Sequence, residues 1–258
     1  MNKILLPLTL LALFEVSSIQ ASTIFLAGSE AASFHNIPAY NTPVFNQLQG
    51  TSTLPILVID NFNATSGYYS GTYTAAITYV SPTVFNSMTM ASLSDYSAIF
   101  FASPGTCCSD PSANLGSQGA NVATFVAGGG SLYVEDYQGN SAWNPIIGLT
   151  VPSSAITSGA PYPGCTDPGV STAAGLAFGF APSYSLSCFE HQTYDPTYWA
   201  AQGYFALQVA GVGATNPGDW VTMATGFVEP GTVPEPNSIV LVGLGFAGLA
   251  ALRRHKSA

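Results

Sequence analysis

Short runs of apolar residues, each followed by a polar turn, predict buried strands in the middle of the chain. Residues 54–60 read Leu-Pro-Ile-Leu-Val-Ile-Asp, and residues 98–102 read Ala-Ile-Phe-Phe-Ala. Both runs are continuous rather than alternating, which is typical of parallel strands buried on both faces. A buried helix gives a similar pattern over so short a run, so periodicity alone leaves that alternative open.

The segment that follows the second run predicts a helix and then another strand. Val122, Phe125 and Val126 have the spacing of one helix face, and Gly128-Gly129-Gly130 ends the pattern. Residues 131–136, Ser-Leu-Tyr-Val-Glu-Asp, begin a new apolar run. A strand, a helix, a glycine stop and a strand make a βαβ unit, so we expect a parallel sheet.

This order of motifs resembles the class I glutamine-amidotransferase-like fold over residues 54–137. The resemblance rests on Leu-x-x-Tyr-x-x-Ile-Phe-Phe, on Phe-Val-x-Gly-Gly-Gly and on Leu-Tyr-Val-Glu. It implies an α/β fold with a flavodoxin-like, mostly parallel sheet and helices on both faces. Residues 138–232 fit it only loosely, with strands expected at 204–210 and 220–228. We expect one extracytoplasmic α/β domain over residues 22–232.

The N-terminal residues have the pattern of a Sec-type signal peptide. One Lys at position 3 precedes an apolar run from Ile4 to Phe14, and a small residue, Ala21, marks the expected cleavage site. The run is shorter than the ~20 residues that span a bilayer. Residues 1–21 are therefore predicted to direct the chain to the Sec translocon and to be removed.

The C-terminal residues combine a proline-rich motif, an apolar stretch and a basic end. Residues 238–252 are apolar and predict a short transmembrane helix, and the flanking residues are Val233, Pro234, Glu235 and Pro236 on one side and Arg253, Arg254 and Lys256 on the other. This order over residues 233–258 resembles the PEP-CTERM sorting signal of Gram-negative bacteria. An ordinary tail anchor, the alternative, would not need the Pro-Glu-Pro motif.

The resemblance to PEP-CTERM implies a destination for the protein. It implies a precursor anchored transiently in the inner membrane, processing by an exosortase, and release or attachment at the cell surface. Proteins with this signal are often found among producers of exopolysaccharide, which makes an extracellular polysaccharide matrix a candidate partner.

The charge pattern excludes several classes of function. The chain has 4 Lys or Arg against 13 Asp or Glu, and no Lys or Arg lies between Ile4 and Leu252. Nucleic-acid binding requires a cationic surface, so no nucleic-acid partner is expected. Enzymes that bind phosphate through a P-loop lysine or an arginine clamp are also excluded, because this part of the chain has no Lys or Arg.

The residues that would form a catalytic nucleophile in the resembled fold are missing. Its catalytic members place a Cys or Ser on a sharp turn after the strand that follows the glycine stop, where this chain reads Val-Glu-Asp-Tyr-Gln over residues 134–138. Amidotransferase activity is therefore not expected. The four cysteines, in an exported chain, suit two disulfides rather than a four-Cys zinc site: Cys107, Cys108, Cys165 and Cys188.

Three disulfide pairings are open for four cysteines. A bond between the adjacent Cys107 and Cys108 would close a strained ring, so we favour each of them pairing with Cys165 or Cys188.

Carboxylates gather after the predicted strands, where open α/β sheets place ligands. The candidates are Asp60, Asp110, Glu135 and Asp136. With no Lys or Arg to pair them, they predict either a Ca²⁺ site or a carboxylate-based glycan site. Hydrogen bonding to loop amides and helix N-termini is the alternative, and we favour it.

Histidines and aromatic residues offer weaker candidates for chemistry. His191 and His35 are the other possible acid–base groups, and His191 would be the base of a hydrolase. The tyrosine-rich segments 68–69 and 194–199 either stack on sugars or cover the sheet.

Three functions remain open from the sequence. We favour an exported, non-catalytic surface or matrix protein that binds polysaccharide. The second is a secreted hydrolase that uses the carboxylate cluster or His191. The third, a small-molecule binding protein associated with a transporter, agrees less well with a C-terminal signal for surface processing.

Overall fold

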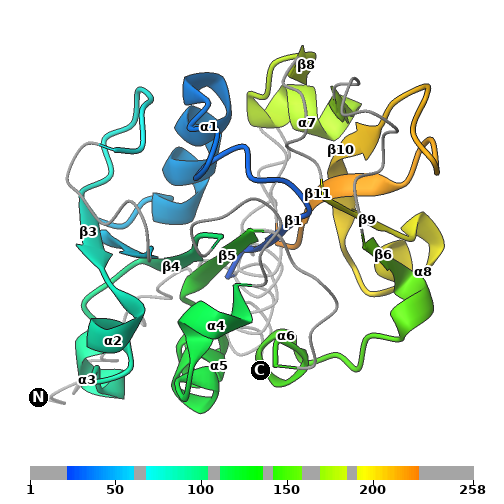
Figure 1. Cartoon of the computed structure of the whole chain (residues 1–258). Helices are drawn as coiled ribbons and strands as arrows, with labels where there is room; N and C mark the ends of the chain where they lie inside the picture. The colour runs from blue at the N-terminus through cyan, green and yellow to red at the C-terminus, as the bar shows by residue number, and fades with distance from the viewer. Residues whose placement is uncertain are drawn as a thin grey trace, which may run out of the picture.

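A computed structural model describes residues 22–60, 68–103, 111–135, 142–158, 169–184 and 191–226. These residues form one eleven-stranded sheet with helices packed against it (Figure 1). The main path of the sheet runs β3-β2-β4-β5-β1-β11-β10-β7-β8, and β6 and β9 join it through β11. Its two halves differ in strand direction.

The first half of the sheet is parallel. Its strands are β1 (Ile24–Ala27), β2 (Ile56–Ile59), β3 (Ile77–Val80), β4 (Ala98–Phe101) and β5 (Ser131–Glu135). All residues of β2, β4 and β5 are buried, as the continuous apolar runs predict for strands covered on both faces. The predicted βαβ unit is confirmed, because β4 and β5 are parallel neighbours joined by a helix and a glycine turn.

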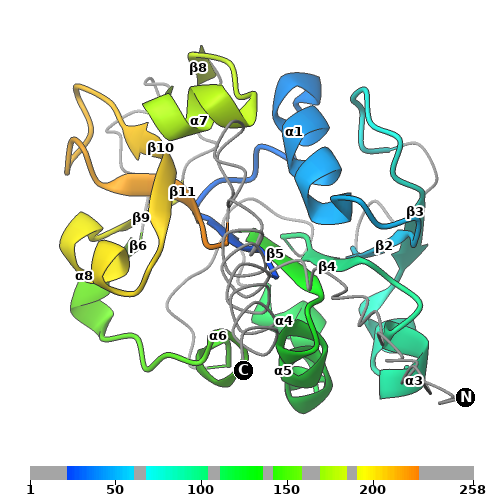
Figure 2. The same cartoon turned by 180° about the vertical axis from the view of Figure 1, so that it is seen from behind.

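The second half of the sheet is antiparallel (Figure 2). Its strands are β6 (Ile156–Ser158), β7 (Gly169–Ser171), β8 (Ser183–Tyr184), β9 (Gln192–Tyr194), β10 (Phe205–Ala210) and β11 (Trp220–Ala224). The strand expected at 204–210 is confirmed by β10, and the strand expected at 220–228 is confirmed over its first five residues by β11, while 227 and 228 lie outside the described residues. β11 pairs antiparallel with β1 and so joins the two halves.

The expectation of a flavodoxin-like, mostly parallel sheet was wrong. Among the described residues, four of the ten strand pairs are parallel and six are antiparallel. The physical reason lies in the second half of the chain, where β10 and β11 are joined by a turn with no crossover helix between them. A parallel pair would need a connection of a dozen or more residues, usually helical. A single domain over residues 22–232 stays a prediction.

Helices cover both faces of the sheet. They are α1 (Pro38–Gln49), α2 (Pro82–Phe85), α3 (Met90–Leu93), α4 (Ser112–Leu115), α5 (Gly119–Ala127), α6 (Asn144–Ile147), the 3₁₀ helix η1 (Ser153–Ala155), α7 (Ala173–Phe178) and α8 (Pro196–Ala201). Proline occupies the first turn of α1, α2, α6 and α8, where its missing N–H costs no hydrogen bond.

The sheet separates two hydrophobic clusters. One contains Val122, Phe125 and Val126 of α5 packed with Leu132 and Val134 of β5. The other contains α1 residues packed with alternate residues of the same strands, including Tyr133 and Phe100, and is rich in aromatic rings. Glu135 follows Tyr133 by two positions, so it lies on the aromatic, α1-covered face.

Within the described residues, none of the helices combines the length and hydropathy that a membrane crossing requires. The predicted signal peptide, residues 1–21, and the predicted transmembrane sorting helix within 233–258 lie outside the described residues.

Candidate functional site

Two buried glutamates meet where the parallel strands β1, β4 and β5 end. Glu135 is the last residue of β5, and its backbone lies opposite Ala27, the last residue of β1. Glu30 follows β1 by three residues. Both side chains are 0% exposed. The carboxyl ends of parallel strands are the usual place for a ligand in such sheets, and here that edge holds acidic groups.

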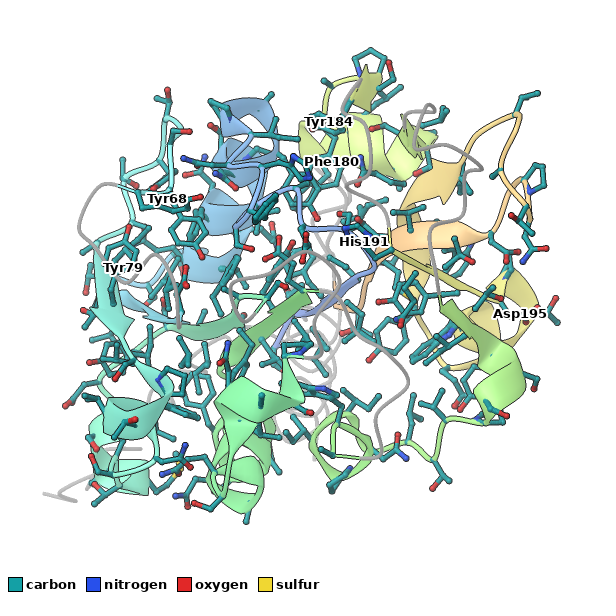
Figure 3. The ribbon with its side chains drawn as sticks, in the orientation of Figure 1. Tyr68, Tyr79, Phe180, Tyr184, His191 and Asp195 are labelled. Atoms are coloured by element: carbon teal, nitrogen blue, oxygen red, sulfur yellow. The ribbon has the colours of Figure 1, made fainter. Side chains whose placement is uncertain are left out.

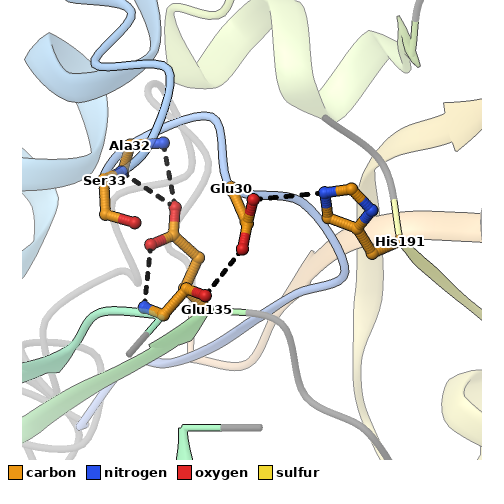
Figure 4. Close-up of polar contacts among 6 residues, drawn as sticks. Glu30, Ala32, Ser33, Glu135 and His191 are labelled. Atoms are coloured by element: carbon orange, nitrogen blue, oxygen red, sulfur yellow. Dashed lines mark hydrogen bonds and ion pairs between the residues drawn. The ribbon is translucent and has the colours of Figure 1, made fainter. Parts of the chain in front are cut away.

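Backbone amides from two loops hold the Glu135 carboxylate (Figure 4). Its Oε1 accepts hydrogen bonds from the N–H groups of Ala32 and Ser33, each at 3.0 Å. Its Oε2 accepts a longer bond from the N–H of Ser103 at 3.3 Å. Glu135 therefore ties the loop after β1 and the loop after β4 to the end of β5.

Burial raises the pKa of Glu135 from 4.5 to about 8, because desolvation penalises its charged form. Hydrogen bonds from Ser33 and Ser103 oppose this rise, and the nearby charge of Glu30 adds to it. At neutral pH the Glu135 side chain is therefore mainly protonated.

Glu30 links a serine to a histidine (Figure 4). Its Oε1 accepts a hydrogen bond from the Ser103 hydroxyl at 2.6 Å, and its Oε2 lies 3.2 Å from Nε2 of His191. His191 is 3% exposed and directly precedes β9. Together with Glu135, the side chains of Glu30, Ser103 and His191 thus connect the segments that follow β1 and β4, the end of β5 and the start of β9.

A glycine allows the loop that carries Glu30 to approach β9. The carbonyl of Gly28 accepts hydrogen bonds from the N–H groups of His191, at 2.7 Å, and Gln192, at 3.0 Å. A Cβ at Gly28 would overlap the carbonyl oxygen of Gln192, so any other residue would push the two segments apart. This close approach brings His191 to Glu30.

Asp60 lies at the same carboxyl edge of the sheet as Glu135, and β4 lies between the strands β2 and β5 that lead to these two residues. It directly follows β2, and its side chain accepts a hydrogen bond from the hydroxyl of Tyr69 at 2.9 Å. Burial raises the pKa of Tyr69 well above 10, and the charges of Asp60 and Glu135 raise it further. Tyr69 therefore stays neutral and donates a hydrogen bond to Asp60.

A line of buried hydroxyl and amide groups crosses the aromatic face next to Glu135. The Tyr40 hydroxyl lies 3.0 Å from that of Tyr133 and 3.3 Å from the hydroxyl of Thr222. Thr222 donates in turn to Oε1 of Gln208 at 2.8 Å. Burial raises the pKa of both tyrosines, so this line is neutral and joins β5, α1, β11 and β10.

The aromatic segments named from the sequence mainly cover the sheet. Tyr69, Tyr194 and Trp199 are each at most 2% exposed. Tyr68 is half-buried and donates its hydroxyl to the carbonyl of Ser33, next to the site. Tyr68 and Tyr79 lie near the β3 edge of the sheet (Figure 3).

The predicted calcium site is only partly covered by the structure. Asp60 and Glu135 lie at the carboxyl edge as expected, while Asp110 and Asp136 lie outside the described residues. Among the residues that the structure describes, no three His, Cys, Asp or Glu side chains form a group that could hold a metal ion. The calcium site with these four ligands stays a prediction.

Two members of the cluster were missed in the sequence, and the cysteines are not described. Glu30 is a lone acid within Ala-Gly-Ser-Glu-Ala-Ala, and an acid in so apolar a context, with no Lys or Arg to pair it, was the available signal. Ser103 carried no signal of its own. Cys107, Cys108, Cys165 and Cys188 lie outside the described residues, so their disulfides stay a prediction.

A sequence motif outside this site decides where the protein goes. The chain carries a PEP-CTERM protein-sorting motif at residues 232–254. The match includes Val233, Pro234, Glu235, Pro236, Arg253 and Arg254, and Lys256 lies just beyond it. This confirms the predicted sorting signal and identifies an exported protein that an exosortase processes.

The other comparisons found no relative of the body of the protein. None of the curated proteins and none of the solved structures matches the chain. The resemblance of residues 54–137 to the glutamine-amidotransferase-like fold therefore has no support from a homologue.

Proposed function

We propose that this exported protein is a non-catalytic component of the cell surface or extracellular matrix of a Gram-negative bacterium, and that it binds polysaccharide. In this proposal the Sec translocon exports the chain and residues 1–21 are removed. The C-terminal helix anchors the precursor in the inner membrane until the exosortase acts. The mature protein is then released or attached at the surface.

One observation carries the non-catalytic part of the proposal. Both oxygens of Glu135 and Oε1 of Glu30 accept hydrogen bonds from the protein itself, Oε2 of Glu30 lies 3.2 Å from Nε2 of His191, and both side chains are fully buried. Buried polar groups that are satisfied in this way stabilise one arrangement of the loops around them. The cluster therefore acts as a structural clamp that joins β1, β4, β5 and β9.

Charge and aromatic residues favour a neutral polysaccharide as the ligand. The body carries no Lys or Arg, so an anionic polymer would be repelled. The rings of Tyr68, Tyr69 and Tyr79 lie together next to the edge strand β3, with centroids 5.4 Å apart for Tyr68 and Tyr69 and 6.0 Å apart for Tyr69 and Tyr79. Tyr68 and Tyr79 are half-buried, which leaves part of each ring open to a sugar.

The hydrolase alternative rests on one contact, the hydrogen bond from the Ser103 hydroxyl to Glu30. A carboxylate in this position can accept the proton of a serine nucleophile, and His191 holds the second oxygen of that carboxylate. This arrangement differs from a serine–histidine pair, in which the histidine contacts the serine.

A binding and degradation assay separates the two functions. The processed protein is incubated with a neutral exopolysaccharide, and bound protein and polymer length are measured together. Saturable binding with unchanged polymer length is expected. Shortening of the polymer that is lost in Ser103→Ala and Glu30→Gln, but kept in the exposed control Ser94→Ala, would establish the hydrolase instead.

A further inference from the structure

Both ends of the described body lie at the same edge of the sheet. β11 runs antiparallel to β1, so the last residues of β11 lie beside the first residues of β1. The N–H of Thr225 donates to the carbonyl of Ile24 at 3.0 Å, and the N–H of Ile24 donates to Oγ1 of Thr225 at 3.2 Å. The chain therefore leaves β11 at the edge where the parallel strands begin, opposite the edge that holds Glu30 and Glu135.

A groove of about 500 Å³ opens at this same edge, and we call it the amino-edge groove. It lies between the end of α1, the α3 region and the end of α5, across the first residues of β4 and β5. Its larger side chains are Leu48, Leu54, Met90, Tyr96 and Phe125, and Leu54 is 41% exposed. The described residues that line the groove include no Asp, Glu, Lys or Arg.

The near end of the groove is at β5, and only β1 separates β5 from β11, where the chain leaves the sheet. Ser131 lines the groove, and its hydroxyl accepts a hydrogen bond from the N–H of Thr23 at 3.3 Å. Thr225 bonds to the next residue, Ile24. Two strand spacings, about 10 Å, therefore separate Thr225 from Ser131. An extended chain covers ~3.3–3.6 Å per residue, so about three residues beyond Thr225 suffice to reach the groove.

We propose that the amino-edge groove binds the connector, residues 227–231, that joins the body to the sorting motif. The connector reads Phe-Val-Glu-Pro-Gly, and the matched motif begins at residue 232. Val228 is the third residue beyond Thr225 and so the first to reach the near end of the groove, and Phe227 places its aromatic side chain one residue before it. Proline-containing extended segments bind grooves lined by aromatic and apolar side chains at low entropic cost; Tyr96 supplies an aromatic ring of this kind, and Phe125, 5% exposed, lies beneath it as part of the core.

Proximity favours the connector over a lipid or a second copy of the chain. A tethered segment of a few residues has an effective concentration in the millimolar range, which a separate molecule reaches only when abundant. A bilayer would also bring anionic headgroups to a body that has no Lys or Arg to receive them. Binding of the connector would hold the sorting motif close to the body of the precursor.

Photo-crosslinking in the full-length precursor, kept in its membrane, tests this proposal. p-Benzoylphenylalanine is placed at Leu54 in one variant, at Tyr96 in a second, and at Val84 of α2 as a control. Val84 is 51% exposed and does not line the groove. After irradiation, mass spectrometry is expected to find intramolecular adducts between the two groove positions and residues 227–231, and none from position 84.

A second set of variants tests the role of Phe227 itself. Phe227→Ser is expected to lower the docking equilibrium constant about tenfold, and the adduct yield with it, whereas Phe227→Leu keeps most of the yield. Adducts to a second chain or to lipid would overturn the proposal, as would the absence of an intramolecular adduct at both groove positions. An unchanged yield in Phe227→Ser would also overturn it.

Discussion

Replacing Glu135 with Gln should make the folding stability clearly less dependent on pH between pH 4.5 and 8. In the folded state burial raises the pKa of Glu135 to about 8, and in the unfolded chain the pKa returns to about 4.5. Between these values the folded state holds a proton that the unfolded state has lost. The free energy of unfolding of the wild-type protein therefore falls as pH rises through this window.

The size of the effect follows from the two pKa values. The difference between about 8 and 4.5, at about 1.4 kcal/mol per pH unit, corresponds to about 5 kcal/mol. For a domain of about 200 residues, 1 kcal/mol shifts the melting temperature by ~2–4 °C, so the whole window corresponds to roughly 10–20 °C. Gln cannot ionise, so its variant should lack this contribution and show a shallower profile over the same range.

Thermal melts from pH 4.5 to 9, run on the wild-type protein, Glu135→Gln and a control, measure this effect. Asp95→Asn is a suitable control because Asp95 is an exposed acid outside the cluster. The control should follow the wild-type profile. Gln also loses the bond that Glu135 Oε2 accepts from Ser103, so a constant offset is expected, but only the slope tests the reasoning. An undiminished slope in Glu135→Gln would refute the assignment of a protonated, buried Glu135.

Three further predictions concern the rest of the site and the cysteines. His191→Ala should destabilise the fold by about 1–3 kcal/mol in urea unfolding, because it leaves the buried Oε2 of Glu30 without the contact that His191 supplies; an unchanged free energy of unfolding would contradict the clamp. Thiol alkylation of the native exported protein should label none of its four cysteines, and reduction should lower its melting temperature clearly, since losing a disulfide costs ~2–5 kcal/mol; four reactive thiols would contradict this. If Ca²⁺ is bound by Asp60, Asp110, Glu135 and Asp136, the melting temperature should be higher with calcium than with chelator. The double variant Glu135→Gln/Asp136→Asn should abolish this difference. Identical melting temperatures in the two buffers would favour the hydrogen-bonded alternative.

Local patterns predicted the first half of the fold well. The buried strands β2, β4 and β5 and the helix α5 each depend on the apolar pattern of a short segment, which is visible in the sequence. The antiparallel half could not be placed in the same way. Its junction with the parallel half is the pair β1–β11, which joins residues about 200 positions apart, and no local pattern encodes that partner.

The candidate site was predictable only in part for a similar reason. Asp60 and Glu135 follow apolar runs directly, so the topology of a parallel sheet places them at one edge. Glu30 lies three residues beyond its strand, and His191 reaches it only because Gly28 lets two distant loops come together. The result is a set of buried contacts from four separate segments, which sequence spacing does not reveal.

The central claim, export and exosortase processing, is tested most directly by mass spectrometry of the native extracellular protein. The account predicts peptides from the body but none from residues 1–20 or 238–258. The same measurement in cells that lack the exosortase should recover the C-terminal peptides in the membrane fraction. Recovery of the intact 238–258 segment in surface material from cells with an active exosortase would contradict the account.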